Sequence, residues 1–276
     1  MKYLVDKVAV VTGAGSGIGM HTSIELAKRG CHLALVDTSL DGLQNTHACV
    51  TDKTRKVSVH QTDVSNAQQM QSLAREIHGI HGSIHILFNN AGIASSDTFV
   101  SMNDDSFRRL MDINVCGVVY GCRFFIPYLN QQSEAHILIT SSIAGLIGLP
   151  VQTAYSMSKA AVRSLSETLR AELYGSNISV TCIIPGAVKT PILQKATQNS
   201  SNEVASQELA GQLMRFALPP EKAAQKIVRA LEKNKARAFI GFDAVLIDIL
   251  NRLAPVSLQK VFTAYYRRSS FYGSGD

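Results

Sequence analysis

The chain has 276 residues, 46% of them hydrophobic and 17% charged, so it can bury a large core and is not expected to be disordered. Its five cysteines lack C-x-x-C spacing, and Met1–Lys7 lacks the apolar run of a secretory signal; we expect a reducing, cytoplasmic location, with no disulfide framework or zinc site. Residues 1–211 hold 16 basic and 16 acidic side chains, whereas residues 212–276 hold 11 and 5 and carry the whole net charge of +6. A basic surface running along the whole chain, as in many nucleic-acid-binding proteins, is therefore excluded.

Short apolar runs alternate with longer stretches of helical periodicity. Strands are expected at Val8–Thr12, Cys31–Val36, Lys56–Gln61, Ile84–Asn89, His136–Ser141 and Ile178–Ile184, and helices at Gly17–Gly30, Leu40–Val50, Asn66–His78, Asp104–Leu129 and Thr153–Tyr174. This order predicts a single α/β domain with a Rossmann-type, doubly wound parallel sheet between two helical layers. We assign residues 1–243 to this catalytic domain and residues 244–276 to a C-terminal extension.

Residues 135–158 contain no Asp, Glu, Lys or Arg and approach the length of a membrane span. The stretch contains Gly148, Pro150 and several hydroxyl residues, however, and its periodicity changes along its length. We expect a buried strand, a loop and the start of a helix here.

A glycine-rich segment, Thr12–Gly19, follows the first expected strand and opens the first expected helix. Such a turn lets the backbone approach phosphates closely and aims the free N–H groups of the helix at them. Candidate residues for binding a dinucleotide here are Gly13, Ser16, Gly17, Ile18 and Gly19.

Asp37 ends the second strand, 24 residues after Gly13. A carboxylate there can accept hydrogen bonds from ribose hydroxyls and would repel a 2′-phosphate. Thr38 and Ser16 provide no positive charge for such a phosphate, so NAD is favoured over NADP.

Polar and small residues also close the third and fourth strands, at Asp63–Val64 and Asn89–Gly92. Open α/β sheets bind ligands at the carboxyl ends of their strands. These segments are individually weak signals, and Asn89–Gly92 alone is equally consistent with an ordinary turn.

Tyr155 and Lys159 lie at positions i and i+4 and share one helix face. A neighbouring ammonium favours the phenolate and lowers the pKa of a tyrosine, so the pair can form a proton-transfer unit. Ser142, 13 residues before Tyr155, can hold a substrate oxygen beside the phenol. Asn114 lies within an expected helix, where it is either a tolerated polar residue or one that holds a water or interrupts the helix near the site.

The turn Pro185–Thr190 follows the sixth strand. Such a turn can pass close to a nicotinamide, with Thr190 offering a hydroxyl.

Together these motifs resemble the classical short-chain dehydrogenase/reductase family over roughly residues 5–240. The matching features are the glycine loop at 12–19, NNAG at 89–92, Asn114, Ser142, Y-x-x-x-K at 155–159 and the Pro-Gly turn at 185–186.

The resemblance implies the role of each candidate residue. Tyr155 would be the general acid/base, with Lys159 lowering its pKa and binding the nicotinamide ribose. Ser142 would position the substrate oxygen, and Asn114 would hold a water in a proton relay. The cofactor would further contact Asp37, Asp63, Val64, Asn90, Ala91, Gly92, Pro185, Gly186, Val188 and Thr190.

The implied reaction is reversible hydride transfer between an alcohol carbon and the nicotinamide of NAD, with NADP less favoured. The alternative is a scaffold or sensor that binds the dinucleotide without turnover. Family members usually form dimers or tetramers, through the helices at Asp104–Leu129 and Thr153–Tyr174.

The substrate is expected to meet the segments Ile93–Phe99, Ile143–Gln152 and Thr190–Phe216, with a mobile insertion inside residues 190–216. Ile143–Gln152 is mostly apolar and favours an apolar secondary alcohol or ketone; the alternative is that it packs against the sheet or another subunit.

In residues 244–268, apolar side chains recur at helical spacing on both sides of Pro255, and Arg267 and Arg268 follow. The simplest interpretation is a helix that completes the core or a subunit interface. A weak peripheral membrane contact is the alternative, and no nucleic-acid recognition motif is evident.

Overall fold

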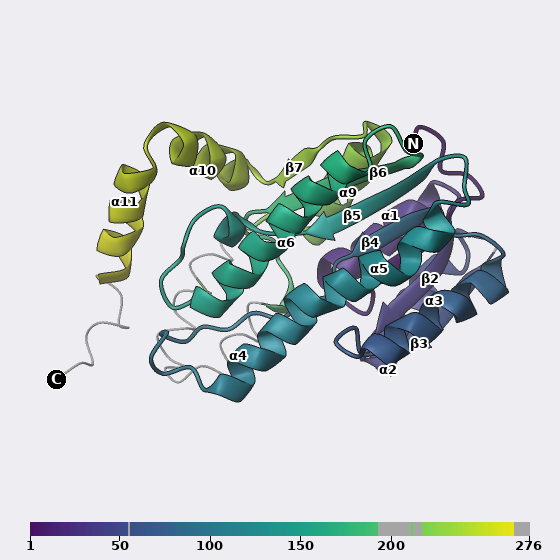
Figure 1. The fold of residues 1–276 in the computed structure, drawn as a ribbon, viewed down its shortest axis with the longest axis horizontal. Helices are drawn as coiled ribbons and strands as arrows, with labels where there is room; N and C mark the ends of the chain where they lie inside the picture. Colours follow the sequence, from purple (N-terminus) through teal and green to yellow (C-terminus); the bar gives the residue numbers. More distant parts are fainter. Residues whose placement is uncertain (55, 193–210, 212–216, 268–276) are drawn as a thin grey trace.

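The fold is built on one seven-stranded sheet. The structure is a computed structural model that describes residues 1–54, 56–192, 211 and 217–267 (Figure 1). The strands are β1 (Val8–Thr12), β2 (His32–Asp37), β3 (Val57–Gln61), β4 (Ile86–Asn89), β5 (Ala135–Thr140), β6 (Ile178–Pro185) and β7 (Arg237–Ile240). All neighbours pair in parallel, in the order β3-β2-β1-β4-β5-β6-β7. The predicted doubly wound Rossmann-type sheet is confirmed.

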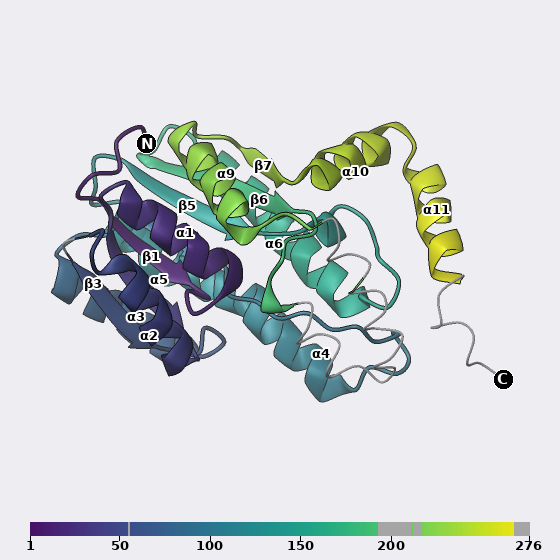
Figure 2. The same ribbon diagram turned by 180° about the vertical axis from the view of Figure 1, so that it is seen from behind.

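Helices cover both faces of this sheet. One face carries α1 (Gly17–Lys28), α2 (Leu40–Val50) and α9 (Pro220–Glu232), and the other carries α3 (Ala67–His81), α5 (Gly117–Leu129) and α6 (Thr153–Glu172) (Figures 1 and 2). Each face has its own apolar core. Leu26, Leu43 and Ile227 are fully buried in the first, and Met70, Phe125 and Val162 in the second. Because both sheet faces are covered, the central strands are apolar without alternation.

The segment 135–158 resolves into β5, a 3-10 turn (Ile143–Gly145) and the start of α6, as expected. Among the described helices, one stretch, Asp104–Leu129, is long and apolar enough to cross a membrane by length and composition. Its residues Val118, Phe125 and Leu129 are buried in the second core, as in the core helix of a folded domain.

Two elements of the sheet domain are absent from the sequence-based expectation, namely α9 and β7. Three of the six buried residues of α9 are alanines, whose hydrophobic signal is weak. Strand β7 has only four residues at the sheet edge, and two of them are only half-buried. Part of the expected substrate segment, at residues 193–210 and 212–216, lies outside the described residues, as does the predicted mobile insertion within it.

After β7 the chain continues into α10 (Phe242–Leu253) and α11 (Pro255–Arg267). Pro255 starts the second helix, so the apolar periodicity noted on both sides of this residue corresponds to two separate helices. Figures 1 and 2 show them at the periphery of the molecule, beyond the end of the sheet. We refer to residues 242–267 as the C-terminal arm.

Candidate active site

The glycine loop between β1 and α1 is shaped by close backbone packing. Gly13 and Gly17 have φ values of +67° and +51°, which favour glycine. A Cβ on Gly19 would lie 2.0 Å from the carbonyl oxygen of Gly13, and one on Gly13 would lie 2.9 Å from the Cα of Ala91. The loop therefore lies against the Asn90–Gly92 segment, and two segments expected to bind the cofactor are brought together.

The N-terminus of α1 suits an anion. Helices α2 and α3 begin with Ser39 and Asn66, whose side chains accept a hydrogen bond from the first turn. Ser16 precedes α1 in the same way, but its side chain accepts no hydrogen bond from the first turn of this helix. That turn also contains no acidic residue. Its N–H groups and the helix dipole are thus available to a pyrophosphate, and the residues present fit a dinucleotide. Ile18, next to them, packs against the first core.

Asp37 is fixed at the end of β2 by two backbone donors. Its Oδ2 accepts from the N–H of Gly15 at 2.9 Å, and its Oδ1 accepts from the N–H of Ser39, also at 2.9 Å. A Cβ on Gly15 would lie 3.0 Å from the Asp37 carboxylate. The carboxylate is consequently held beside the glycine loop, where it can meet a ribose.

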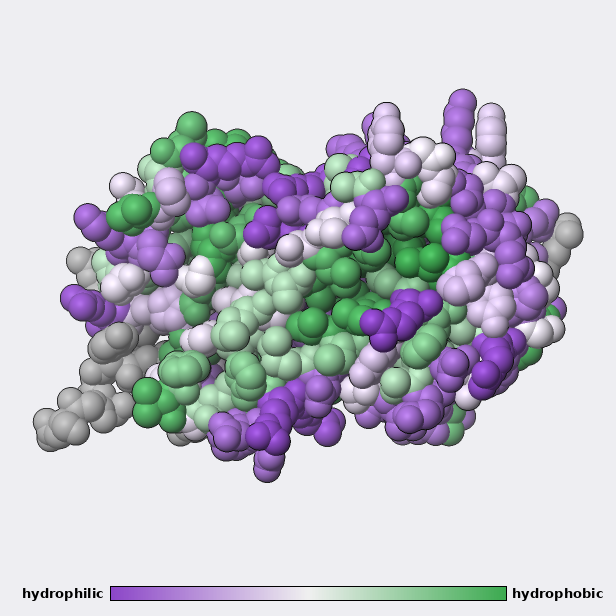
Figure 3. Space-filling model, in the orientation of Figure 1, coloured by the Kyte–Doolittle hydropathy of each residue, from purple (hydrophilic) through white to green (hydrophobic). Residues whose placement is uncertain are grey.

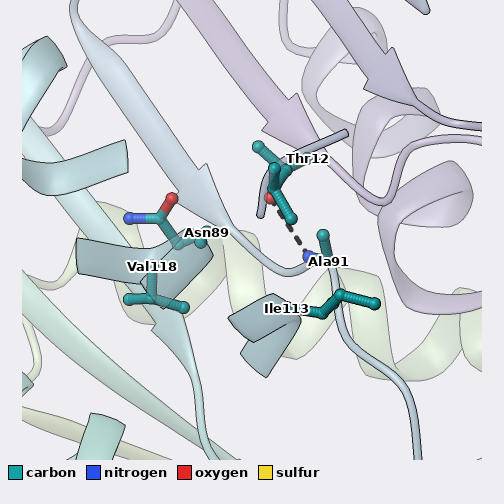
Figure 4. A pocket seen from close by; sticks show the side chains of 7 residues that line it. Thr12, Asn89, Ala91, Ile113 and Val118 are labelled. Carbon is teal, nitrogen blue, oxygen red and sulfur yellow. Dashed lines mark hydrogen bonds between the residues drawn. The ribbon is translucent and has the colours of Figure 1, made fainter. Parts of the chain in front are cut away.

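A small pocket lies where β1 and β4 end, at the point where the strand order reverses (Figure 4). Ligands bind at such points in open α/β sheets. The Oγ1 of Thr12 accepts from the N–H groups of Asn90 (2.9 Å) and Ala91 (3.1 Å), and its hydroxyl donates to Phe88 O at 3.3 Å. Figure 4 shows the hydrogen bond between Thr12 and Ala91. Thr12 thus joins the two strand ends, a role that the sequence analysis misses although this threonine begins the glycine motif.

Val64 lines the same pocket, whereas Asp63 has a local partner. Asp63 Oδ1 accepts from the N–H and hydroxyl of Ser65 at 2.9 and 2.7 Å. This carboxylate shapes the turn into α3.

Asn114 interrupts the helix predicted at Asp104–Leu129. α4 (Asp104–Met111) and α5 are separated by a π-helical turn, Asp112–Cys116, with Asn114 at its centre and fully buried. Its Oδ1 accepts from the N–H of Ile93 (2.8 Å), and its Nδ2 donates to Ile93 O (2.9 Å) and Ser158 Oγ (3.0 Å). Such turns frequently mark functional sites. Asn114 is therefore more than a tolerated polar residue: it ties the segment after Gly92 to α6.

Ser142, Tyr155 and Lys159 converge at the carboxyl end of β5. The side chains of Ser142 and Tyr155 are hydrogen-bonded. The Nζ of Lys159 lies 5.7 Å from the centroid of the Tyr155 ring and donates to the carbonyl of Thr140 at 3.0 Å. A Cβ on Gly92 would lie 3.3 Å from this Nζ, so the NNAG segment adjoins the same group.

Burial governs the charges of this group. It raises the pKa of Tyr155 above the ordinary value, and the hydrogen bond from Ser142 opposes this rise only in part. It also lowers the pKa of Lys159 to about 8. The lowered tyrosine pKa that the sequence predicts is wrong for this structure, because the loss of water outweighs the hydrogen bond from Ser142. At neutral pH the site therefore holds a phenol that can donate a proton.

The turn after β6, Pro185–Thr190, faces the glycine loop and is hydrogen-bonded to a residue of the C-terminal arm. A Cβ on Gly17 would lie 3.0 Å from Thr190 Cγ2. Val188 and Thr190 are both buried, and Val188 pairs with Leu218 in an isolated bridge. Pro185 ends β6, and Gly186 continues the pairing by donating its N–H to Ile240 O at 2.9 Å.

Asp243 supports this turn and is a second residue that the sequence analysis misses. Its Oδ2 accepts from the N–H of Ala187 at 2.7 Å. A Cβ on Gly186 would lie 2.0 Å from the same oxygen, and one on Gly241 would lie 2.2 Å from Oδ1. The two glycines create the space for this carboxylate, and the Gly-x-Asp spacing after the last strand is the only signal of this in the sequence.

This fold, the open glycine loop at the end of β1 and the Ser-Tyr-Lys group define a dinucleotide-binding oxidoreductase of the Rossmann type. The short chain dehydrogenase model matches residues 7–201. SadH of Mycobacterium tuberculosis, which is named as an oxidoreductase, is 34% identical over 96% of this chain and 96% of its own. The 3-oxoacyl-(acyl-carrier-protein) reductase FabG of Thermotoga maritima is 30% identical over 88% of this chain and 99% of its own.

Among solved structures, a short chain dehydrogenase/reductase from Burkholderia phymatum in complex with NAD superposes with a TM-score of 0.86. It is 30% identical and matches 94% of this chain and 97% of its own. The chain belongs to the short-chain dehydrogenase/reductase family. It is an oxidoreductase that binds a nicotinamide dinucleotide.

Proposed function

We propose that this protein catalyses reversible hydride transfer between NAD(H) and a secondary alcohol or ketone of apolar character, with Tyr155 as general acid/base. The observation that carries the proposal is the group formed by the buried Ser142 and Lys159 and the half-buried Tyr155 at the carboxyl end of β5. A bound nicotinamide supplies the hydride donor or acceptor.

In the direction of carbonyl reduction, the Tyr155 phenol donates its proton to the substrate oxygen. Ser142, hydrogen-bonded to this phenol, presents a second polar contact to the same oxygen. Lys159 holds its ammonium beside the ring and binds the nicotinamide ribose. In the reverse direction, the phenolate removes the proton of the alcohol.

Asn114 holds together two segments beside the catalytic group. Its contacts with Ile93 and Ser158 join two segments, and the hydroxyl of Ser158 lies 2.8 Å from the carbonyl of Tyr155. In our proposal this amide and the adjoining backbone hold the water through which a proton passes from Lys159 to solvent.

The preference for NAD rests on Asp37. Its carboxylate is held by the N–H groups of Gly15 and Ser39 and cannot swing away freely to admit a 2′-phosphate. A negative charge fixed at the ribose position repels that phosphate.

An apolar substrate is supported by the loop between β5 and α6. Ile147 and Val151 are buried in it, and Leu146 and Leu149 are half-buried near the catalytic residues. An apolar wall of this kind gains from burying hydrocarbon and offers no cation to a carboxylate or phosphate.

Assembly into a dimer or tetramer is part of the proposal. Figure 3 shows a broad apolar band over the helices of the front face, where α5 and α6 lie in Figure 1. Faces of this kind commonly form subunit contacts.

The proposal is tested with Tyr155→Phe and a panel of secondary alcohols. The wild type should produce NADH from at least one alcohol, and the variant should lose this activity. The variant should still bind NADH, as measured by the change in NADH fluorescence on titration with protein. A well-folded Phe variant that keeps its dehydrogenase activity would overturn the assignment of Tyr155. Dinucleotide binding by the wild type without turnover on any alcohol or ketone would favour the alternative of a scaffold or sensor.

A further inference from the structure

The outer face of the C-terminal arm is unusually apolar for an exposed surface. Of the 18 large hydrophobic side chains that are exposed in the described residues, nine lie between Phe242 and Tyr265. Leu253 is 78% exposed and Val256 is 68% exposed. Leu246, Ile249 and Leu250 continue this face along α10. Figure 3 shows apolar side chains at the upper left, where Figure 1 places these helices.

Two polar side chains of the arm, Asn251 and Gln259, point the other way, toward the protein. Asn251 Nδ2 donates to Leu146 O at 3.3 Å, and Gln259 Nε2 donates to Gly148 O at 3.1 Å. Tyr266 and Val151 form a small buried cluster. The arm is therefore anchored to the apolar loop beside the catalytic residues, and its anchoring leaves the hydrophobic residues outward.

Acidic and basic side chains of the arm also differ in their exposure. The acidic side chains of residues 242–267, all of which the structure describes, are withdrawn: Asp243 accepts from Ala187 N–H, and Asp248 is buried and paired with Arg252 at 3.0 Å. The exposed charged side chains of the same residues are Arg252, Lys260 and Arg267, and all three are basic; Asp248 neutralises the first, so Lys260 and Arg267 provide the net positive charge. The outer face thus combines exposed hydrocarbon with positive charge.

We propose that the outer face of α10 and α11 is a docking surface for an anionic phospholipid bilayer. Hydrocarbon side chains enter the boundary between headgroups and acyl chains, and the basic side chains meet the negative headgroups. A second copy fits the same face less well. In a two-fold contact each patch faces itself, so the exposed cations of one arm would meet those of the other without an exposed acidic residue on either arm to pair with them.

Docking in this way places the loop from Leu146 to Val151 near the membrane, since the arm is bonded to it. An apolar alcohol or ketone dissolved in the bilayer then reaches the catalytic group without crossing bulk water. This consequence rests on the proposed function, whereas the docking itself does not.

The test is flotation of the full-length chain with vesicles of phosphatidylcholine alone and with phosphatidylglycerol added. We expect binding to the anionic vesicles at low salt and release at high salt. The triple variant Leu246→Glu, Ile249→Glu and Leu253→Glu should reduce binding at least about tenfold, because burial of even one such side chain is worth about this factor. Lys260→Gln should reduce it about fivefold.

Tyr174→Glu is the matched control, because Tyr174 is 92% exposed and lies just after the C-terminal end of α6. This variant should bind vesicles as the wild type does. Unchanged thermal unfolding and NADH binding of the triple variant would show that it is folded. The proposal is overturned if the wild type does not float with anionic vesicles at low salt, or if the triple variant floats equally well. It is also overturned if the triple variant instead lowers the oligomer mass in light scattering without losing vesicle binding, since the face would then be a contact between copies. Flotation requires no turnover, so failure here is distinguishable from failure of the proposed dehydrogenase activity.

Discussion

Replacement of Asp243 by alanine tests whether a residue outside the predicted motifs holds the turn Pro185–Thr190 in place. The carboxylate accepts from the N–H of Ala187 at 2.7 Å and fills the space next to Gly186. A hydrogen bond to a charged group contributes roughly 1.5–3 kcal/mol, and removing the acceptor leaves the amide without this partner. We expect a loss of about 2 kcal/mol in the free energy of unfolding. For a domain of this size this corresponds to a fall in Tm of about 4–8 °C.

Asp243→Asn is the matched control, because it keeps an oxygen in the same place and removes only the charge. Scanning calorimetry should place its Tm between those of the wild type and the alanine variant. The KM for NAD should rise severalfold in the alanine variant and less in the asparagine variant, with a smaller change in kcat, because the turn is expected to contact the cofactor and not the substrate proton. An equal loss in both variants would refute the hydrogen-bond argument. A lowered Tm with an unchanged KM for NAD would show that Asp243 supports the fold alone.

Three further predictions concern charge. Asp37→Asn removes the negative charge and keeps one of the two acceptor oxygens, so the ratio of the Kd for NADP to that for NAD should fall about tenfold or more in a fluorescence titration; an unchanged ratio would place the discrimination elsewhere. In the protein without NAD, the ultraviolet difference spectrum between wild type and Tyr155→Phe should show the Tyr155 phenolate only above pH 10, because burial raises the pKa of Tyr155, and a transition near pH 7 would contradict this. Burial lowers the pKa of His136 to about 3, so its neutral form is favoured by folding; stability should be fully present above about pH 6.5 and fall as pH drops toward 3, by up to about 1.4 kcal/mol per pH unit. Urea unfolding of His136→Gln should show a shallower dependence on pH over this range, and an identical slope would exclude this histidine as a cause.

The central sheet could be predicted well because its strands are covered on both faces. Val8–Thr12 and Leu40–Val50 match the observed β1 and α2 to the residue. The other predicted strands and helices match at one end or differ by at most three residues, which is common at helix and strand ends, whereas the predicted helix Asp104–Leu129 is divided by the turn at Asn114. The edge strand β7 was not predicted, because its four residues, two of them half-buried, have too little apolar pattern to be distinguished from a loop.

The candidate site was predictable to the extent that its residues occur in short motifs with fixed spacing. Spacing along the chain cannot show which distant groups complete these motifs, such as the contact of Thr12 with Ala91 or that of Asn114 with Ser158. The direction of the pKa shift of Tyr155 was predicted wrongly for a different reason. Proximity of Lys159 suggests a lowered value, but the loss of water around the phenol is a property of the folded protein and dominates the result.

The arm connects the two ends of the site in a way that the sequence motifs do not reveal. Through Asp243 it bonds to the turn after β6, and through Asn251 and Gln259 it bonds to the loop after β5. Displacement of the arm therefore strains a segment expected to meet the nicotinamide and a segment expected to meet the substrate. Any partner that binds the outer face will act on both segments through the same few hydrogen bonds. Vesicle binding should accordingly change the KM for NAD as well as that for the substrate, whereas an apolar patch unconnected to the site would change neither.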